Sequence, residues 1–227
     1  SLPDSARQET FRRTTRFARG ENPEVVRRLP KLPVQVYSYD DLRLVAAEFL
    51  ARHHPDATIP TPIEELVDLR LKIDIVPVAR LEWEDDTAAY LSADLKEIRV
   101  DKHAMESNSN RYRFSLAHEL SHLLLHRDIY QKLRPVTAAD WKSKLRAISE
   151  EDYGWIEWQA YSLAGLILVP PGHLQVEFAS VTSTVRSVGL STDTDAVRLA
   201  VEKKLGTRFW VSGDVVSRRL RYDSLWQ

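Results

Sequence analysis

Cysteine is absent from the sequence, which excludes disulfide bonds, thiolate ligands to zinc and cysteine nucleophiles. A bound metal would therefore need histidine and carboxylate ligands. An excess of one charge is absent as well, because 32 basic residues stand against 33 acidic residues, so the overall charge gives no attraction for nucleic acid. The sequence also lacks an apolar run of the roughly 18–20 residues that span a membrane, and its first residues show no signal-peptide pattern. We expect a cytoplasmic protein without membrane segments.

The sequence is long enough for one sizeable domain preceded by an arm. Its 227 residues, 43% hydrophobic and 29% charged, are typical of a soluble globular protein. Residues 1–35 differ from the rest, because they carry eight basic and four acidic residues (net +4), few apolar residues and four prolines. We predict an extended or partly disordered arm over residues 1–37 and a single domain over residues 38–227. A solvated tail is the favoured role of the arm, and contact with nucleic acid or an acidic partner is the alternative.

The segment Arg111–His126 reads RYRFSLAHELSHLLLH and contains the pattern HExxH. On a helix, His118 and His122 lie one turn apart and point into the same space, where two neutral imidazoles can hold zinc. Glu119 stands beside them, where its carboxylate can accept a proton from an attacking water. Apolar residues on nearly every other face favour a buried helix. The segment therefore predicts the metal helix of a zinc peptidase, and a chance pattern with partly exposed histidines is the weaker alternative.

A catalytic zinc usually takes three protein ligands and keeps one open position, so a further ligand is needed. His126 is a poor candidate, because eight residues along a helix put it about 12 Å from His118, and a place at the helix C-terminus suits it better. Glu157 instead opens a second strong helix over residues 157–169, whose alanines would let it pack closely on the first helix. We favour Glu157 as the third ligand, and a solvated carboxylate at a helix N-terminus is the alternative.

The periodicity between the arm and the metal helix predicts a mixture of helices and short strands, hence an α+β fold with a small antiparallel sheet packed on the HExxH helix. An edge strand beside that helix could hold an extended peptide by backbone hydrogen bonds. Pro77 marks either an edge or an end of the first strand. The predicted elements are a helix over 38–54, a helix from Thr61 that buries Ile63, Leu66, Val67 and Leu69, strands over 73–78, 88–91 and 97–100, and a polar connection over 101–110.

The C-terminal subregion, residues 171–227, is predicted to contain further helices. A helix beginning near Ser191 is followed by a short strand over Phe209–Val211 and by a second helix capped by Ser212. Three arginines of this last helix are expected to be exposed: Arg218, Arg219 and Arg221. Two helices around a turn raise the question of a helix-turn-helix DNA-binding unit, but the intervening strand argues against it. We do not expect direct nucleic-acid binding.

Several of these segments together resemble the ImmA/IrrE family of zinc peptidases. The resemblance rests on AHELSHLLLH, on the helix that starts EWQA and ends LVP, on KIDIV and EIRVDK before the metal helix, and on RFWVSGDVVSRRL near the C-terminus. It covers roughly residues 38–222. Two features depart from the family pattern, because Ser121 stands where the family usually has glycine and residues 127–156 are longer than usual.

The resemblance implies a zincin-like metallopeptidase domain in which His118, His122 and Glu157 hold the metal. It also implies a regulatory endopeptidase whose protein substrate is a helix-turn-helix transcriptional repressor, with a role in transcription regulation or stress response. Zinc is the expected cofactor, although a site of two histidines and one glutamate also accepts manganese or iron. The alternative is a non-proteolytic antirepressor or antitoxin-like binding protein with a structural metal site.

The expected chemistry is hydrolysis of a peptide bond with Glu119 as the general base. An oxyanion-stabilising group is also expected. The candidates for it are Tyr153, Tyr161, His173 and Arg113. Glu119 favours the enzyme over the binding protein, because a purely structural metal site does not need a carboxylate that activates water.

Overall fold

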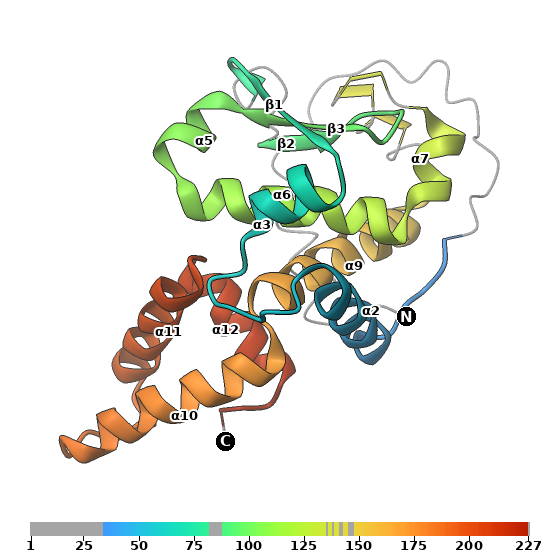
Figure 1. The fold of residues 1–227 in the computed structure, drawn as a ribbon. Helices are drawn as coiled ribbons and strands as arrows, with labels where there is room; N and C mark the ends of the chain where they lie inside the picture. Colours follow the sequence, from blue (N-terminus) through green and yellow to red (C-terminus); the bar gives the residue numbers. More distant parts are fainter. Residues whose placement is uncertain are drawn as a thin grey trace, which may run out of the picture.

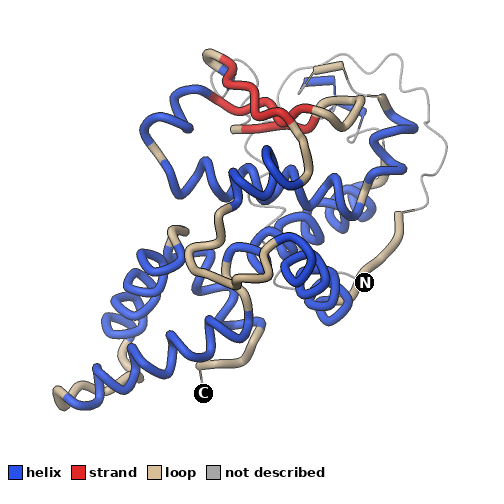
Figure 2. The backbone as a smooth tube through the Cα atoms, in the orientation of Figure 1, coloured by secondary structure: helices blue, strands red, loops and turns tan. Residues whose placement is uncertain are grey.

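The computed structural model describes residues 34–81, 88–134, 136–137, 139–140, 143–144 and 148–226. Most of the predicted arm lies outside these residues, so the division into arm and domain stays a prediction. Figures 1 and 2 show a small sheet on one side of the molecule and helices over the rest. The described elements are α2 Tyr39–His53, α3 Ile63–Glu65, η2 Leu66–Arg70, β1 Asp74–Val78, β2 Ala89–Leu91, β3 Glu97–Asp101, α5 Lys102–Ser107, α6 Ser109–Leu125, α7 Arg127–Leu133, α9 Glu150–Leu168, α10 Pro171–Ser187, α11 Asp195–Phe209 and α12 Gly213–Tyr222.

The elements form successive layers, which confirms the α+β class with additional C-terminal helices. The sheet covers one side of α6, and α9 packs against α6 from the other side. Helix α2 and the C-terminal helix α12 then contact α9. Figure 1 shows α10, α11 and α12 together at the end of the molecule far from the sheet. Helices α6 and α9 therefore lie at the centre of the fold. No helix in the described ranges has the length and apolar character needed to cross a membrane.

The sheet is mixed, so the prediction of a wholly antiparallel sheet was wrong. The predicted hairpin is present, because β2 runs antiparallel to β3 with Leu91 opposite Ile98. Strand β1, however, pairs parallel to β3 on its other side, in the order β1-β3-β2. The chain between β1 and β2 thus crosses from one edge of the sheet to the other, and the alternation of apolar residues carries no information about that direction. Pro77 lies in the edge strand β1, as predicted, since it cannot donate to a ladder.

Local sequence explains where the helices begin. Helix α2 begins directly after Ser38 with a capping box, in which the Ser38 hydroxyl and the Asp41 carboxylate each accept a hydrogen bond from the other residue's backbone N–H. The predicted polar connection after β3 is instead largely helical, because the Asp101 carboxylate accepts from the Ala104 N–H and caps α5. The helix predicted from Thr61 is also corrected in part. Leu69 was expected on its buried side but is exposed, because the chain continues from α3 into a π-helical turn that rotates this side chain outward.

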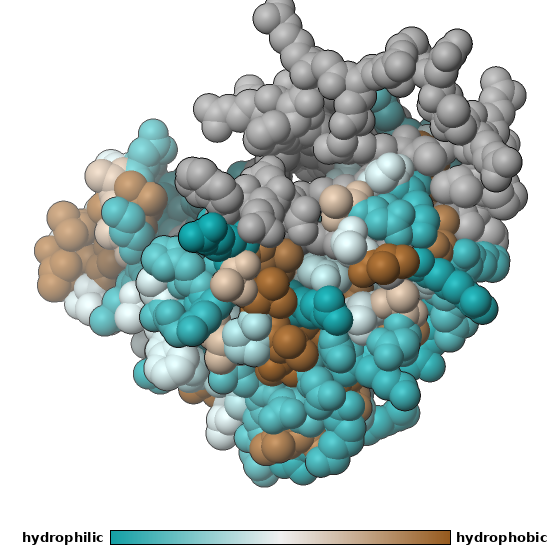
Figure 3. All heavy atoms as spheres, turned by 90° about the horizontal axis from the view of Figure 1, so that it is seen from above, coloured by the Kyte–Doolittle hydropathy of each residue, from teal (hydrophilic) through white to brown (hydrophobic). Residues whose placement is uncertain are grey.

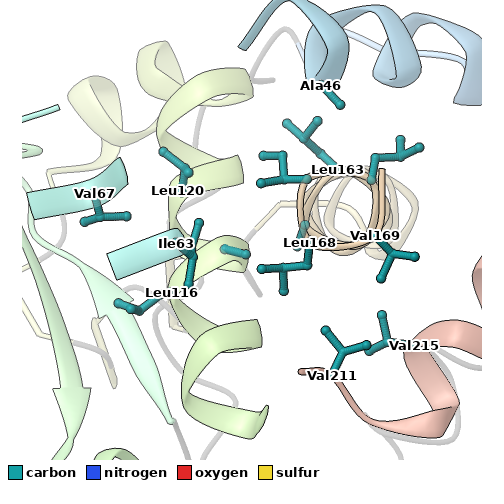
Figure 4. Packing of buried hydrophobic residues seen from close by; sticks show 14 of the residues in the cluster. Ala46, Ile63, Val67, Leu116, Leu120, Leu163, Leu168, Val169, Val211 and Val215 are labelled. Carbon is teal, nitrogen blue, oxygen red and sulfur yellow. The ribbon is translucent and has the colours of Figure 1, made fainter. Parts of the chain in front are cut away.

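Helix α9 holds the core together from the inside. Figure 4 shows it along its axis, with Leu163 and Leu168 among the side chains around it, Ala46 of α2 on one side and Val211 and Val215 on another. From Ala160 to Val169, almost every residue of this segment is buried. A helix that is apolar on nearly all faces needs packing partners on all sides. Helix α6 with the sheet behind it, helix α2 and the C-terminal helix α12 supply them. On the face seen in Figure 3, by contrast, hydrophobic residues form small groups among hydrophilic ones.

The C-terminal helices differ from their prediction in two respects. Helix α11 continues through Phe209, and Trp210 closes it in the left-handed conformation, so the predicted strand is wrong. Arg219 is buried rather than exposed. The argument from a strand against a helix-turn-helix unit is therefore lost. Another argument replaces it: α12 buries Val215, Val216 and Arg219, whereas a recognition helix must present its face to DNA.

Arg219 joins three distant parts of the chain. Its guanidinium donates to the Val169 carbonyl at the end of α9 at 3.1 and 3.3 Å, and to the Tyr39 hydroxyl at the start of α2. It also pairs with the buried Asp223 carboxylate at 2.9 Å, and Arg43 of α2 pairs with the same carboxylate. These bonds satisfy an orphan helix carbonyl and a buried anion together.

We expect Arg219→Ala to lower the free energy of unfolding by about 3 kcal/mol, because the buried Asp223 carboxylate loses one of its two positively charged partners and the Val169 carbonyl loses its donor. Urea denaturation followed by circular dichroism measures this. Arg221→Ala is the matched control, since Arg221 is exposed on the same helix, and its effect should stay within about 0.5 kcal/mol. Equal effects of the two substitutions would contradict the assigned role.

Candidate metal centre

Helix α6 brings His118 and His122 together on the face that looks toward α9. Their Nε2 atoms lie 3.1 Å apart, and their rings meet edge to face. His122 is almost fully buried, while the His118 side chain keeps 18% of its surface exposed. The spacing of four residues thus produces the predicted convergence, with one histidine in the core and the other at the opening.

Glu157 reaches the same point from α9. It does not open this helix, as was predicted, but lies two turns inside it, because the helix already begins at Glu150 after the cap Ser149. One carboxylate oxygen lies 3.4 Å from His118 Nε2, and the other lies 3.6 Å from His122 Nε2. The two helices pack against each other, and Ala160 and Ala164, one and two turns after Glu157 on α9, are fully buried and small enough to permit a close approach. The structure therefore brings the three predicted ligands together from two helices.

The spacing of these donor atoms fits a small tetrahedral ion. Two ligands at about 2.0–2.1 Å from zinc, with a tetrahedral angle between them, are about 3.3 Å apart. The three separations are 3.1, 3.4 and 3.6 Å. Two imidazoles and one carboxylate are also the donors that such an ion accepts. His118, His122 and Glu157 could therefore hold a divalent metal ion without rearrangement of the backbone.

Glu119 lies at the back of the site, between α6 and the sheet. Its carboxylate accepts a hydrogen bond from the Leu91 backbone N–H of β2 at 2.9 Å. Its nearest oxygen and the ligand nitrogens of His118 and His122 all lie within 4.8 Å of one another. Burial raises the pKa of Glu119 to about 7, and the nearby Glu157 carboxylate acts in the same direction. Near neutral pH this group can therefore both accept and release a proton.

The histidines respond to burial in the opposite direction. Burial lowers the pKa of His122 well below its usual range, and the neighbouring His118 and His126 lower it further. The neutral imidazole is the form that ligates a metal. The low-dielectric site thus favours the protonation state that a metal ligand requires.

His126 ends α6, as predicted, but it is not a cation at the helix C-terminus. It is buried, and burial lowers its pKa to about 4. Its Nδ1 lies 3.0 Å from Nδ1 of His122, on the side of that ring away from Glu157. We missed this contact in the sequence, although the spacing of four residues that joins His118 to His122 also joins His122 to His126.

The four candidates for an oxyanion-stabilising group have different surroundings. Tyr161 lies beside the site, with its ring centre 6.3 Å from that of His118 and the Arg218 guanidinium 4.4 Å above its ring centre. Arg113 is buried and donates to the Thr61 and Trp210 carbonyls. Tyr153 packs against the hydrophobic core, and His173 lies in the first turn of α10. Tyr161 is thus the candidate for which the structure supplies a contact with a site residue.

A family model and a solved structure both resemble this chain. A peptidase family model described as the IrrE N-terminal-like domain matches residues 72–221. Among the solved structures that match is a Mycobacterium tuberculosis transcriptional regulator, at 19% sequence identity and a TM-score of 0.48, over 80% of this chain and 46% of that one. The chain therefore spans less than half the length of that protein. No curated protein matches the chain.

We expect Glu157→Ala to lower the affinity for Zn²⁺ by about 100-fold or more, because it removes one of three converging donors. Competition with a chromophoric chelator measures this affinity. Glu150→Ala, in the exposed first turn of the same helix, is the control and should leave the affinity unchanged. Full retention of Zn²⁺ by the Glu157 variant would show that Glu157 is not a ligand.

The raised pKa of Glu119 also predicts a pH-dependent stability of the metal-free protein. A carboxyl whose pKa rises from 4.5 to about 7 on folding keeps its proton in the folded chain after the unfolded chain has lost it. Its contribution to the free energy of unfolding therefore falls as pH rises from about 4.5 to about 7. We expect metal-free Glu119→Gln to equal the unsubstituted protein near pH 4 and to be more stable by about 3 kcal/mol at pH 8, as measured by urea denaturation at each pH. A gap that does not change with pH would contradict this.

Proposed function

The chain belongs to the IrrE N-terminal-like family of peptidases, and from this premise we propose that it is a zinc-dependent endopeptidase that cleaves a helix-turn-helix transcriptional repressor. The observation that carries the proposal is the convergence of His118, His122 and Glu157 beside a buried carboxylate, Glu119. A structural metal site would need only its ligands. Peptide hydrolysis also needs a group that accepts and releases a proton, and the Glu119 carboxylate, whose pKa burial raises to about 7, lies beside the ligands.

In the proposed mechanism, His118, His122 and Glu157 would hold a zinc ion. When bound, the ion would supply Lewis-acid polarisation of the scissile carbonyl and would lower the pKa of the attacking water. Glu119 takes the proton from that water and carries it to the leaving amine. The hydrogen bond from the Leu91 N–H fixes one oxygen of Glu119, so that the carboxylate keeps its orientation through both transfers.

The geometry of strand β2 favours the proposal that the substrate is a peptide. The Ala88 carbonyl and the Ser92 N–H are hydrogen-bonded to strand β3 of the hairpin. In an antiparallel ladder every second residue points its backbone N–H and C=O away from the partner strand, so the backbone groups of Ala89 and the carbonyl of Leu91 face the edge of β2 opposite β3, on the side of Glu119. An extended peptide that added to this edge would lie with its backbone beside the general base.

A hollow at the end of the same strand supports binding of a substrate side chain. The turn after β2 and the end of helix α7 border an open hollow of about 530 Å³. It is lined by Ala93, Asp94, Leu95, Gln131 and Arg134. A peptide antiparallel to β2 would bring residues on the N-terminal side of its scissile bond toward this hollow.

We expect Glu119→Gln to lower kcat by about 10²–10⁴-fold, because it removes the proton acceptor and keeps the shape of the side chain. The assay incubates the zinc-loaded protein with purified helix-turn-helix repressors, starting with one encoded next to its gene where such a repressor exists, and follows cleavage by electrophoresis and mass spectrometry. Zinc content and repressor binding should stay unchanged. Glu150→Gln provides the matched control and should cleave normally.

The same experiment separates the enzyme from a non-proteolytic antirepressor or antitoxin-like protein. Relief of repression by Glu119→Gln, with the repressor intact, would favour sequestration and overturn the endopeptidase proposal. Loss of both cleavage and relief, with binding retained, supports it. Metal analysis of protein purified without added metal distinguishes zinc from manganese or iron.

A further inference from the structure

A second histidine–histidine contact lies directly behind the candidate metal site. Nδ1 of His126 is 3.0 Å from Nδ1 of His122, whereas Nε2 of His122 faces His118 and Glu157. Both rings are almost fully buried. The two nitrogens of the His122 ring therefore meet different partners, with the metal-facing donors on one side and His126 on the other.

The chemistry of the neutral imidazole links these two sides. A metal ion bound to Nε2 of His122 requires the lone pair of that atom, so the ring proton must reside on Nδ1. Nδ1 of His126 lies within hydrogen-bonding distance and can accept a hydrogen bond from this N–H when the proton of its own ring is on Nε2.

The backbone fixes the His126 ring where this bond needs it. The His126 N–H donates to the His122 carbonyl at 2.8 Å, which completes the last turn of α6. The Ile129 and Tyr130 N–H groups donate to the His126 carbonyl at 2.9 and 3.1 Å and so begin α7. His126 thus belongs to both helices, and its ring has little freedom to turn away. Among the described residues, the Nε2 atom of His126 has no hydrogen-bond partner. The hydrogen-bonding contact of this ring is therefore the one that its Nδ1 atom makes with His122.

We propose that His126 is a positioning residue that accepts a hydrogen bond from Nδ1 of His122, selects the tautomer that can bind metal and fixes the plane of that ring. The proposal rests on the metal site proposed above. Such partners of ligating histidines typically change metal affinity by about 10–100-fold. The role differs from that of a fourth ligand, because His126 faces the far side of His122.

The test measures Zn²⁺ affinity by chelator competition for His126→Leu and His126→Asn. The leucine variant keeps an apolar side chain of similar bulk but has no acceptor, and we expect its affinity to fall about 10–100-fold. The asparagine variant can present its side-chain oxygen near the position of Nδ1, and we expect recovery to within about threefold of the unsubstituted protein. His54→Leu is the matched control, because His54 is likewise a buried histidine at the end of a helix, bonded to the Thr58 carbonyl. It should leave Zn²⁺ affinity unchanged.

A measurement on the unsubstituted protein covers the case in which a variant does not fold. In zinc-loaded protein with ¹⁵N-labelled histidine, the His122 proton should be found on Nδ1, with a scalar coupling across the hydrogen bond to Nδ1 of His126. A proton on any other atom, unchanged affinity in His126→Leu, or an asparagine variant no better than the leucine variant would overturn the proposal. Zn²⁺ binding that does not depend on Glu157 would instead show that the metal site itself is wrong, so the two failures are distinguishable.

Discussion

The close contact of α6 with α9 is the constraint on which the rest of the structure depends. Ala160 and Ala164 of α9 are small and fully buried one and two turns after Glu157, which favours a close approach of the two helices. Because the two helices are this close, a carboxylate from α9 reaches within 3.4 and 3.6 Å of two imidazole nitrogens on α6. The sheet and the outer helices then serve to bury this pair from both sides, since neither helix has a large polar face of its own.

Burial of the pair also sets the chemistry of its polar groups. The same loss of solvent raises the pKa of Glu119 and lowers that of His122, because in each case the charged form is disfavoured. For the carboxylate the result is a group that exchanges protons near neutral pH, and for the imidazole it is a free lone pair. Burial is thus the largest cause of both shifts, and it gives the carboxylate and the imidazole the protonation states that the proposed hydrolysis needs.

The parts of the fold that depend on local pattern were predictable, and those that depend on chain direction or on distant contacts were not. The helical spacing gave the convergence of His118 with His122, and the cap at Ser38 gave the start of α2. The parallel pairing of β1 has no signature in the alternation of its residues. Arg219 is buried where the Val169 carbonyl and the Tyr39 hydroxyl from other segments meet it, and an amphipathic pattern cannot reveal such partners. Membership of the peptidase family was also recognisable from the sequence, because the segments around the two metal helices keep the family pattern.

The hydrogen bond from β2 to Glu119 has a consequence for how such a protein can diverge. Its donor is the main-chain N–H of Leu91, which every residue except proline possesses. Any residue other than proline that packs in this buried position can therefore supply the same donor. For the endopeptidase proposed above, this means that the orientation of the general base does not depend on the side chains that would select a peptide.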